Sequence, residues 1–220
     1  MLDEMYNRMF EAFGSQHWWP GDSALEIMVG AVLTQNTSWT NVESAIRNLR
    51  EANLLHLHQL YEASDADIES AIRPAGYFRV KTQRLKNLLG FVTNEFGNLD
   101  AMFEEPLEEL RPRLLSVNGV GPETADAILL YAGNKPTFVV DAYTTRIVER
   151  HGWVPLGSSY ETIKRHFETQ LSPSVAHFNE FHALIVQIGK HHCKPTPRCD
   201  DCPLKPMLPS TGIVGLPPQT

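Results

Sequence analysis

The stretch LLSVNGVGPETADAILLYA, residues Leu114–Ala132, decides how the rest of the chain is interpreted. Its NGVG turn at residues 118–121 is followed at once by a helix whose first residue is Pro122. Two glycines two positions apart let the backbone turn sharply and leave amide N–H groups pointing outward. Beside a helix N-terminus such amides suit a phosphate, and because main-chain atoms hold it, the contact reads no base sequence. An ordinary corner between two helices fits these residues equally well.

The composition indicates a globular protein. The 220 residues are 42% hydrophobic, which is enough for a sizeable core in one domain or two small ones. No apolar run reaches transmembrane length, and the acidic, amphipathic start MLDEMYNRMF lacks the features of a secretory signal, so we expect a cytoplasmic protein. The net charge of −7 argues mildly against general electrostatic binding of nucleic acid, although residues 78–86 and 111–113 are locally basic.

Apolar residues recur at helical spacing almost everywhere. This spacing predicts amphipathic helices that include Leu25–Leu33, Leu85–Val92, Ala125–Ala132 and Phe181–Ile188. Ser23 and Glu26 form a capping box in front of the first of these helices. The one candidate strand is the short segment TFVVDA, residues 137–142. We therefore predict an all-α protein of roughly ten helices joined by short Gly, Pro and Asn turns.

An aspartate follows the helix of the opening stretch. Asp141 comes directly after the apolar residues 138–140 and precedes a helix that carries Arg146 and Arg150. An aspartate at such a position commonly caps the helix that it precedes.

The whole block from Leu115 to Arg150 resembles the helix-hairpin-helix, Gly/Pro-rich loop and aspartate of the endonuclease III superfamily of DNA glycosylases, which act in base excision repair. Hairpin, helix, VVD and TTRI occur here in the family's order, and further helices extend the resemblance over most of residues 20–205. The resemblance implies a central helical domain of residues 22–133 that ends in the hairpin. It implies a second domain made of residues 1–21 and 134–220, with the extruded nucleotide in the cleft between the two. The implied partner is double-stranded DNA with a damaged base, bound by a monomer at the bacterial nucleoid.

The resemblance also implies roles for individual residues. In the family the hairpin clamps the DNA backbone, and the matching DNA-contacting residues here are Asn118, Gly119, Val120, Gly121, Thr124 and Arg146, with the amides of residues 119–121 on phosphate. Asp141 matches the catalytic carboxylate. Breaking an N-glycosidic bond builds an oxocarbenium-like sugar, and a fixed negative charge stabilises that sugar and orients a water molecule.

Glu123 occupies a position that separates two reactions. Bifunctional members of the family have a lysine there, whose amine attacks the sugar and forms a Schiff base. A carboxylate cannot form an imine, so we expect hydrolysis that leaves an abasic site, unless Lys135 or Lys190 supplies the amine. The alternatives are a bifunctional glycosylase and AP lyase acting on oxidised pyrimidines, and a non-catalytic DNA-binding module.

The HWWPGD segment, with Trp18, Trp19 and Pro20, resembles the Trp-Trp-Pro of bacterial 3-methyladenine glycosylases of this fold. Those enzymes also have a glutamate at the position of Glu123 and an aromatic residue after Gln-Asn-Thr, where Trp39 stands here. We expect Trp18 and Trp39 to sandwich the flipped base, while Trp19, Pro20 and Glu123 shape the pocket. A hydrophobic lid or an interface plug is the alternative for the tryptophan pair. An alkylpurine such as 3-methyladenine leaves readily because it carries positive charge, and it would gain cation–π attraction of about 1–2 kcal/mol from such rings.

Gln35, in the segment LTQNT, matches the family's glutamine that enters the duplex and fills the gap left by the extruded base. The alternative is a capping network with Asn36 and Thr37 for the next helix.

Three cysteines lie close together near the C-terminus: Cys193, Cys199 and Cys202. An odd number at this spacing argues against a disulfide framework and for metal ligation or its remains. The segment resembles the iron–sulfur loop of endonuclease III, except that Leu208 stands in place of the fourth cysteine and one gap is a residue short. A structural 4Fe–4S cluster normally takes four thiolates. Three could retain it with His191 or His192, which would also suit zinc; a loop that keeps its shape without metal is the reading we prefer. The chemistry needs no cofactor.

Overall fold

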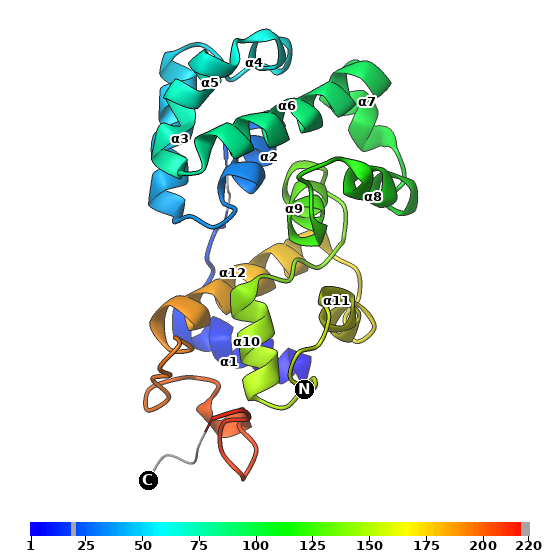
Figure 1. Ribbon diagram of the computed structural model, residues 1–220. Coiled ribbons are helices and arrows are strands. Elements are labelled where there is room, and N and C mark those ends of the chain that lie inside the picture. Colours follow the sequence, from blue (N-terminus) through cyan, green and yellow to red (C-terminus); the bar gives the residue numbers. More distant parts are fainter. Residues whose placement is uncertain (19–20, 217–220) are drawn as a thin grey trace. The chain divides into compact units, whose positions relative to one another are not determined.

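The computed structural model describes residues 1–18 and 21–216, and every regular element in that part of the chain is a helix. The predicted all-α class is thereby confirmed. The chain divides into two compact units, one made of Met1–Trp18 and Pro136–Thr220, the other of Trp19–Lys135 (Figure 1). We call the first the aspartate unit and the second the hairpin unit. Among the described residues, no helix combines the length and apolarity needed to cross a membrane.

The hairpin unit is built around a nearly all-apolar helix. Its elements are α2 (Ala24–Leu33), α3 (Trp39–Glu51), α4 (Leu57–Glu62), α5 (Asp65–Ile72), the 3-10 turn η1 (Arg73–Ala75), α6 (Phe78–Glu95), α7 (Leu99–Glu104), α8 (Leu107–Ser116), α9 (Pro122–Ala127) and the π-helix η2 (Ile128–Ala132). Helix α2 contacts α3, α6, α9 and η2. Because these neighbours surround it, α2 has apolar residues on nearly every side, as is typical of a helix in the middle of a core. Ser23 caps α2 by accepting from the Glu26 amide, but the Glu26 carboxylate pairs with Arg50 at 2.7 Å and does not close the expected capping box.

The aspartate unit has fewer helices and an aromatic core. Its elements are α1 (Leu2–Phe13), α10 (Ala142–Arg150), α11 (Tyr160–Glu168), α12 (Val175–His191) and the 3-10 turn η3 (Lys205–Met207). Helix α12 contacts both α1 and α10, as Figure 1 shows within this unit. Phe138 stacks on Phe167 with 4.0 Å between ring centroids and meets Phe178 and Phe181 edge-on. These rings join α11, α12 and the segment before α10 into one core.

The candidate strand, residues 137–142, is extended, but it pairs with no other strand in the described chain. Its amides bind side chains of α11 instead. The Phe138 amide donates to Glu168 Oε1 at 2.8 Å, and the Val140 amide donates to the Tyr160 hydroxyl at 3.4 Å. The segment forms no sheet, and side chains of a helix bind these two amides of its backbone.

Candidate functional site

Asp141 caps helix α10, as the sequence predicts, and the cap engages one of its two carboxylate oxygens. Oδ1 accepts from the Thr144 amide at 2.7 Å and from the Thr144 hydroxyl at 2.8 Å. Oδ2 lies 3.7 Å from His182 Nε2. The Asp141 side chain is 14% exposed, so the carboxylate is fixed and largely enclosed.

His182 belongs to α12 and was not singled out by the sequence analysis. Burial lowers the pKa of His182, and the negative charge of Asp141 acts against that lowering. Its signal in the sequence is a histidine inside the apolar run from Phe181 to Ile188, where a polar side chain needs a reason. Spacing alone does not connect it to Asp141, because the two lie on different helices.

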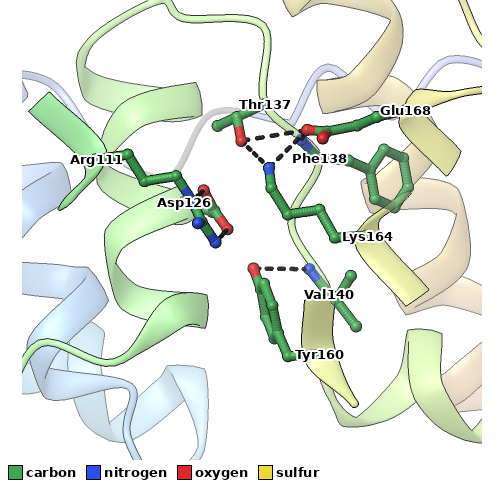
Figure 2. Close-up of polar contacts among 8 residues, drawn as sticks. All are labelled: Arg111, Asp126, Thr137, Phe138, Val140, Tyr160, Lys164 and Glu168. Carbon is green, nitrogen blue, oxygen red and sulfur yellow. Dashed lines mark hydrogen bonds and ion pairs between the residues drawn. The ribbon is translucent and has the colours of Figure 1, made fainter. Parts of the chain in front are cut away.

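One face of α11 anchors the backbone that leads to Asp141. Tyr160, Lys164 and Glu168 are four residues apart and share that face. Lys164 Nζ donates to Glu168 Oε1 at 2.6 Å and also to the Thr137 hydroxyl, and Figure 2 shows the ammonium between these two oxygens. With the Phe138 and Val140 amides also bound to this face, the segment has little freedom to shift. The Asp141 carboxylate is thus fixed by its cap on α10, and the backbone that precedes Asp141 is fixed by α11.

The two glycines of the hairpin turn differ in what they do. Gly119 has a φ of +97°, and a Cβ there would overlap the Arg84 side chain. Gly121 has a φ of −91°, and a Cβ there would meet open space. The geometry of the turn therefore requires glycine at position 119 only. At position 121 the fold would accept a side chain. A ligand that came close to this backbone from outside would be blocked by one.

The amides of the turn are also not equivalent. The Val120 amide, which we expected to be directed at phosphate, donates to the Val117 carbonyl at 3.0 Å, and the Val120 side chain is buried. Within the described residues, the amides of Gly119 and Gly121 donate no hydrogen bond. Asn118 is exposed, and its carbonyl accepts from Asn87 Nδ2 at 3.0 Å.

Gln35 is tied to the hairpin from the loop after α2. Its Nε2 donates to the Gly119 carbonyl at 3.1 Å and to the Thr124 hydroxyl at 2.9 Å, while its Oε1 accepts from Arg84. The buried Thr124 therefore serves this network. Helix α3 begins after Ser38 without a side-chain cap, so Gln35 is not part of a capping network.

The predicted pocket residues lie on both units. In the aspartate unit, Lys190 Nζ lies 5.9 Å from the centre of the Trp18 ring. In the hairpin unit, the Trp39 indole donates to Glu43 at 3.0 Å and Glu123 is exposed on the first turn of α9. The other two predicted residues, Trp19 and Pro20, lie outside the described residues.

The three cysteines lie close together in the structure. They line one small pocket together with Leu208, the residue in place of the fourth cysteine. No group of three or more His, Cys, Asp or Glu side chains in the described chain is arranged to hold a metal ion. A 4Fe–4S cluster needs four ligands, and an apolar leucine supplies none, so these residues do not fit such a cluster.

The arginines of α10 hold the loop that carries the cysteines. Arg150 donates to the Lys194 carbonyl at 2.6 Å and to the Pro195 carbonyl at 2.8 Å. Arg146, which we expected to contact DNA, donates to the Cys193 carbonyl at 2.6 Å. Both guanidinium groups thus bind the protein's own backbone.

Chemically, the most specific arrangement is the one around Asp141. A carboxylate with one oxygen in a cap and the other beside a buried imidazole can stabilise a nearby positive charge or orient a water molecule. The hairpin unit offers a turn with two outward amides, which can hold an anion by main-chain contacts.

Comparison with known proteins agrees with this arrangement. The family model described as HhH-GPD superfamily base excision DNA repair protein matches residues 29–173. A Methanocaldococcus jannaschii protein named as a DNA repair glycosylase is 42% identical over 207 residues, which cover 93% of this chain and 94% of that protein. The structure of Helicobacter pylori 3-methyladenine DNA glycosylase bound to 1,N6-ethenoadenine is similar with a TM-score of 0.73 and 26% identity, covering 86% of this chain and 94% of that one. An endonuclease III in a non-covalent complex with DNA has a similar fold, with a TM-score of 0.81, 21% identity and coverage of 94% and 93%.

Proposed function

Because the chain belongs to the HhH-GPD superfamily of base excision DNA repair proteins, we propose that it is a monofunctional DNA N-glycosylase. It hydrolyses the bond between deoxyribose and a damaged base that is flipped out of double-stranded DNA, and it leaves an abasic site. The family match spans both the hairpin turn and Asp141. The observation that carries the proposal is the carboxylate of Asp141, with Oδ1 held in a helix cap and Oδ2 outside it.

Asp141 is the catalytic residue in this proposal. As the glycosidic bond breaks, positive charge develops on the sugar, and a carboxylate already fixed in place stabilises it without reorganising. The same carboxylate orients the water molecule that attacks the sugar. Anchoring of residues 137–140 by α11 supports this role, because electrostatic stabilisation requires that the charge stay where it is.

The reaction stops at base release because residue 123 is a glutamate. Strand cleavage through a Schiff base requires a nucleophilic amine at the sugar, and Glu123 has none. Lys190 lies in the same unit as Asp141, and it is the lysine whose removal would test a bifunctional alternative.

The substrate is an alkylated purine. The similarity to a 3-methyladenine DNA glycosylase supports this class, and Trp18 and Trp39 are the rings on which the base would stack. Lys190 Nζ, 5.9 Å from the Trp18 ring, repels a cationic base placed on that ring. Trp18 therefore contributes stacking more than cation–π attraction, and a neutral adduct such as 1,N6-ethenoadenine belongs in the same assay as 3-methyladenine.

The hairpin holds the DNA backbone through the amides of Gly119 and Gly121, and Gln35 fills the gap that the extruded base leaves. Main-chain contacts of this kind depend little on net charge, which reconciles DNA binding with a chain of charge −7. The Gln35 side chain would exchange its hydrogen bonds to the hairpin for bonds to the orphaned base. The protein acts as a monomer at the nucleoid.

The cysteine loop folds without an iron–sulfur cluster. Arg146 and Arg150 hold its carbonyl groups, and Leu208 stands in the pocket where a fourth ligand would be needed. Iron content and visible absorbance of the purified protein test this directly: a stoichiometric cluster would overturn it and leave the glycosylase proposal untouched.

The test of the function is release of free bases from methylated duplex DNA, compared between the parent protein and Asp141→Asn. Asparagine caps helices as well as aspartate does, so the variant removes the charge and keeps the cap. We expect its kcat to fall by about 100-fold or more while DNA binding and the melting temperature stay unchanged. Full turnover by Asp141→Asn would contradict the role of this carboxylate.

Borohydride trapping distinguishes the alternatives. No covalent protein–DNA adduct is expected from the parent protein. An adduct that disappears in Lys190→Met would establish the bifunctional alternative. DNA binding by a parent protein that releases no base would establish a non-catalytic module.

A further inference from the structure

The two oxygens of Asp141 have different environments. Oδ1 has two donors from Thr144, both within 2.8 Å. Oδ2 has His182 Nε2 at 3.7 Å, which is longer than a hydrogen bond but close enough for a strong electrostatic effect in an enclosed site. Any change of charge on His182 therefore acts mainly on the oxygen that the cap does not use.

His182 is enclosed on α12, with neighbours in the chain that are fully buried, among them Phe181 and Leu184. About two turns further along α12, a Cβ at Gly189 would overlap the Tyr143 ring, so α10 and α12 approach closely there. Little water can reach such a position, so a change in charge there is poorly screened.

Asp141 is a charged group that acts on His182. From α10 the facing group is Asp141 itself. The charge that α1 directs at α12 is Asp3, which acts on His177, and Glu180 acts on Tyr6 of α1. Burial lowers the pKa of His182, so its imidazole is neutral at neutral pH and gains a proton only in acid.

We propose that His182 is a positioning residue for Asp141 that also makes base release sensitive to acid; this rests on the proposed catalytic role of Asp141. The neutral imidazole directs an Nε2–H group towards Oδ2 and limits its rotation. The protonated imidazole forms an ion pair with Oδ2 and neutralises the charge that the developing oxocarbenium needs. The step is a protonation from solvent, so no bond in the substrate is involved.

The sharpest variant is His182→Gln, whose amide nitrogen can occupy the place of Nε2 and cannot become a cation in this range of pH. We expect the kcat of the parent protein to fall on the acid side, by up to about 10-fold per pH unit once the pH is below the lowered pKa of His182, because a single proton is gained there. His182→Gln should retain the kcat of the parent at about pH 7.5, to within about threefold, and lose most of the acid-side decline.

His182→Leu completes the design, because it removes the polar atom and keeps the bulk. Its kcat at about pH 7.5 should fall about 10-fold or more with KM unchanged, as expected when positioning is lost and binding is not. His177→Gln is the matched control: it changes another α12 histidine whose pKa burial also lowers, but which packs on Tyr6 of α1 with 4.6 Å between ring centroids. It should keep the parent's pH profile. An acid decline that is the same in His182→Gln as in the parent would refute the proposal.

A second measurement does not depend on activity. The proton-dependent NMR shifts of His182 should report a lower pKa in Asp141→Asn than in the parent protein, because the variant removes the negative charge that favours the imidazolium. An unchanged titration would show that the two groups do not interact and would overturn the inference by itself. If the parent protein releases no base, the proposed function fails, whereas this titration still decides whether His182 and Asp141 are coupled.

Discussion

Two aspartates of this chain show how the same side chain is used in two ways. Asp126, on α9, is fully buried, and Arg111 donates to both of its oxygens: Nε to Oδ1 at 2.8 Å and Nη2 to Oδ2 at 3.0 Å (Figure 2). Asp141 uses Oδ1 for a helix cap and has a titratable imidazole beside Oδ2. Both oxygens of the first carboxylate are engaged by one guanidinium group, whereas the second carboxylate has only Oδ1 in its cap.

The partners reinforce this difference. A guanidinium group stays charged at any pH that a protein survives and binds both carboxylate oxygens in one plane. An imidazole changes its charge near neutral pH, and at 3.7 Å it makes no hydrogen bond that would saturate Oδ2. Asp126 is therefore expected to matter for stability and Asp141 for activity.

The most direct way to break the comparison is to neutralise each carboxylate in turn. Asp126→Asn should lower the free energy of unfolding by about 3–5 kcal/mol, because it removes the buried charge that accepts both hydrogen bonds from Arg111. Asp141→Asn should lower it by less than about 1 kcal/mol, since asparagine keeps the cap. Urea denaturation measures both. Glu95→Gln is the control: it breaks the exposed pair with Arg113 and should cost about 0–1 kcal/mol. Equal losses of unfolding free energy in the two variants would contradict this distinction between the two aspartates.

The support behind Asp141 gives the next largest effect. Glu168→Gln weakens the partner of the buried Lys164 and the acceptor of the Phe138 amide, so we expect a loss of about 1–3 kcal/mol in unfolding free energy. The kcat for base release should fall as well, because the backbone before Asp141 is less well held. Arg165→Gln, at an exposed position of the same helix, should change neither quantity beyond the error of the measurement. A Glu168→Gln protein with full kcat would show that this support is not needed for catalysis.

A pair of glycines repeats the contrast between stability and function in the hairpin unit. Gly119→Ala places a Cβ at a φ of +97° and against Arg84, so it should destabilise the protein by about 1–2 kcal/mol or more. Gly121→Ala meets neither obstacle and should leave the melting temperature unchanged while weakening binding to duplex DNA. Thermal melting and fluorescence anisotropy separate the two. Normal DNA binding by Gly121→Ala would argue against a phosphate at this amide.

The smallest effect is on the pH dependence of stability. Burial lowers the pKa of His182 and of His151 from 6.5, so below that pH the unfolded chain binds protons that the folded protein does not. Stability is therefore full above about pH 6.5 and falls as the pH decreases, by up to about 1.4 kcal/mol per pH unit for each histidine. His182→Gln should make this decline shallower by one histidine's share. An identical decline in the variant would mean that His182 does not contribute.

Local patterns predicted much of this molecule. Helical spacing indicated the all-α class, and Ser23 does cap α2. Asp141 caps α10 because an aspartate before a helix can reach the amide three residues on, which is a purely local geometry. The turn before Pro122 also follows from its own residues, although only one of its glycines has a positive φ.

Local patterns did not indicate partners that lie far away in the sequence. Residues 137–142 have the composition of a strand, yet their amides bind Glu168 and Tyr160 of α11. Arg146 lies on a helix that follows the aspartate, but its guanidinium binds the Cys193 carbonyl. No periodicity reports such pairings, because they depend on which helices pack together.

The order of residues alone therefore established the helical class, the hairpin turn, the capping aspartate and the family to which they point, since each depends on neighbours a few positions apart. Tertiary packing decided that His182 faces the second oxygen of Asp141, that Gln35 binds the hairpin, and that two arginines hold the cysteine loop. The physical reason is the range of the interactions: caps and turns are closed within one turn of chain, whereas the charge environment of a carboxylate is made by whatever helix the core brings beside it.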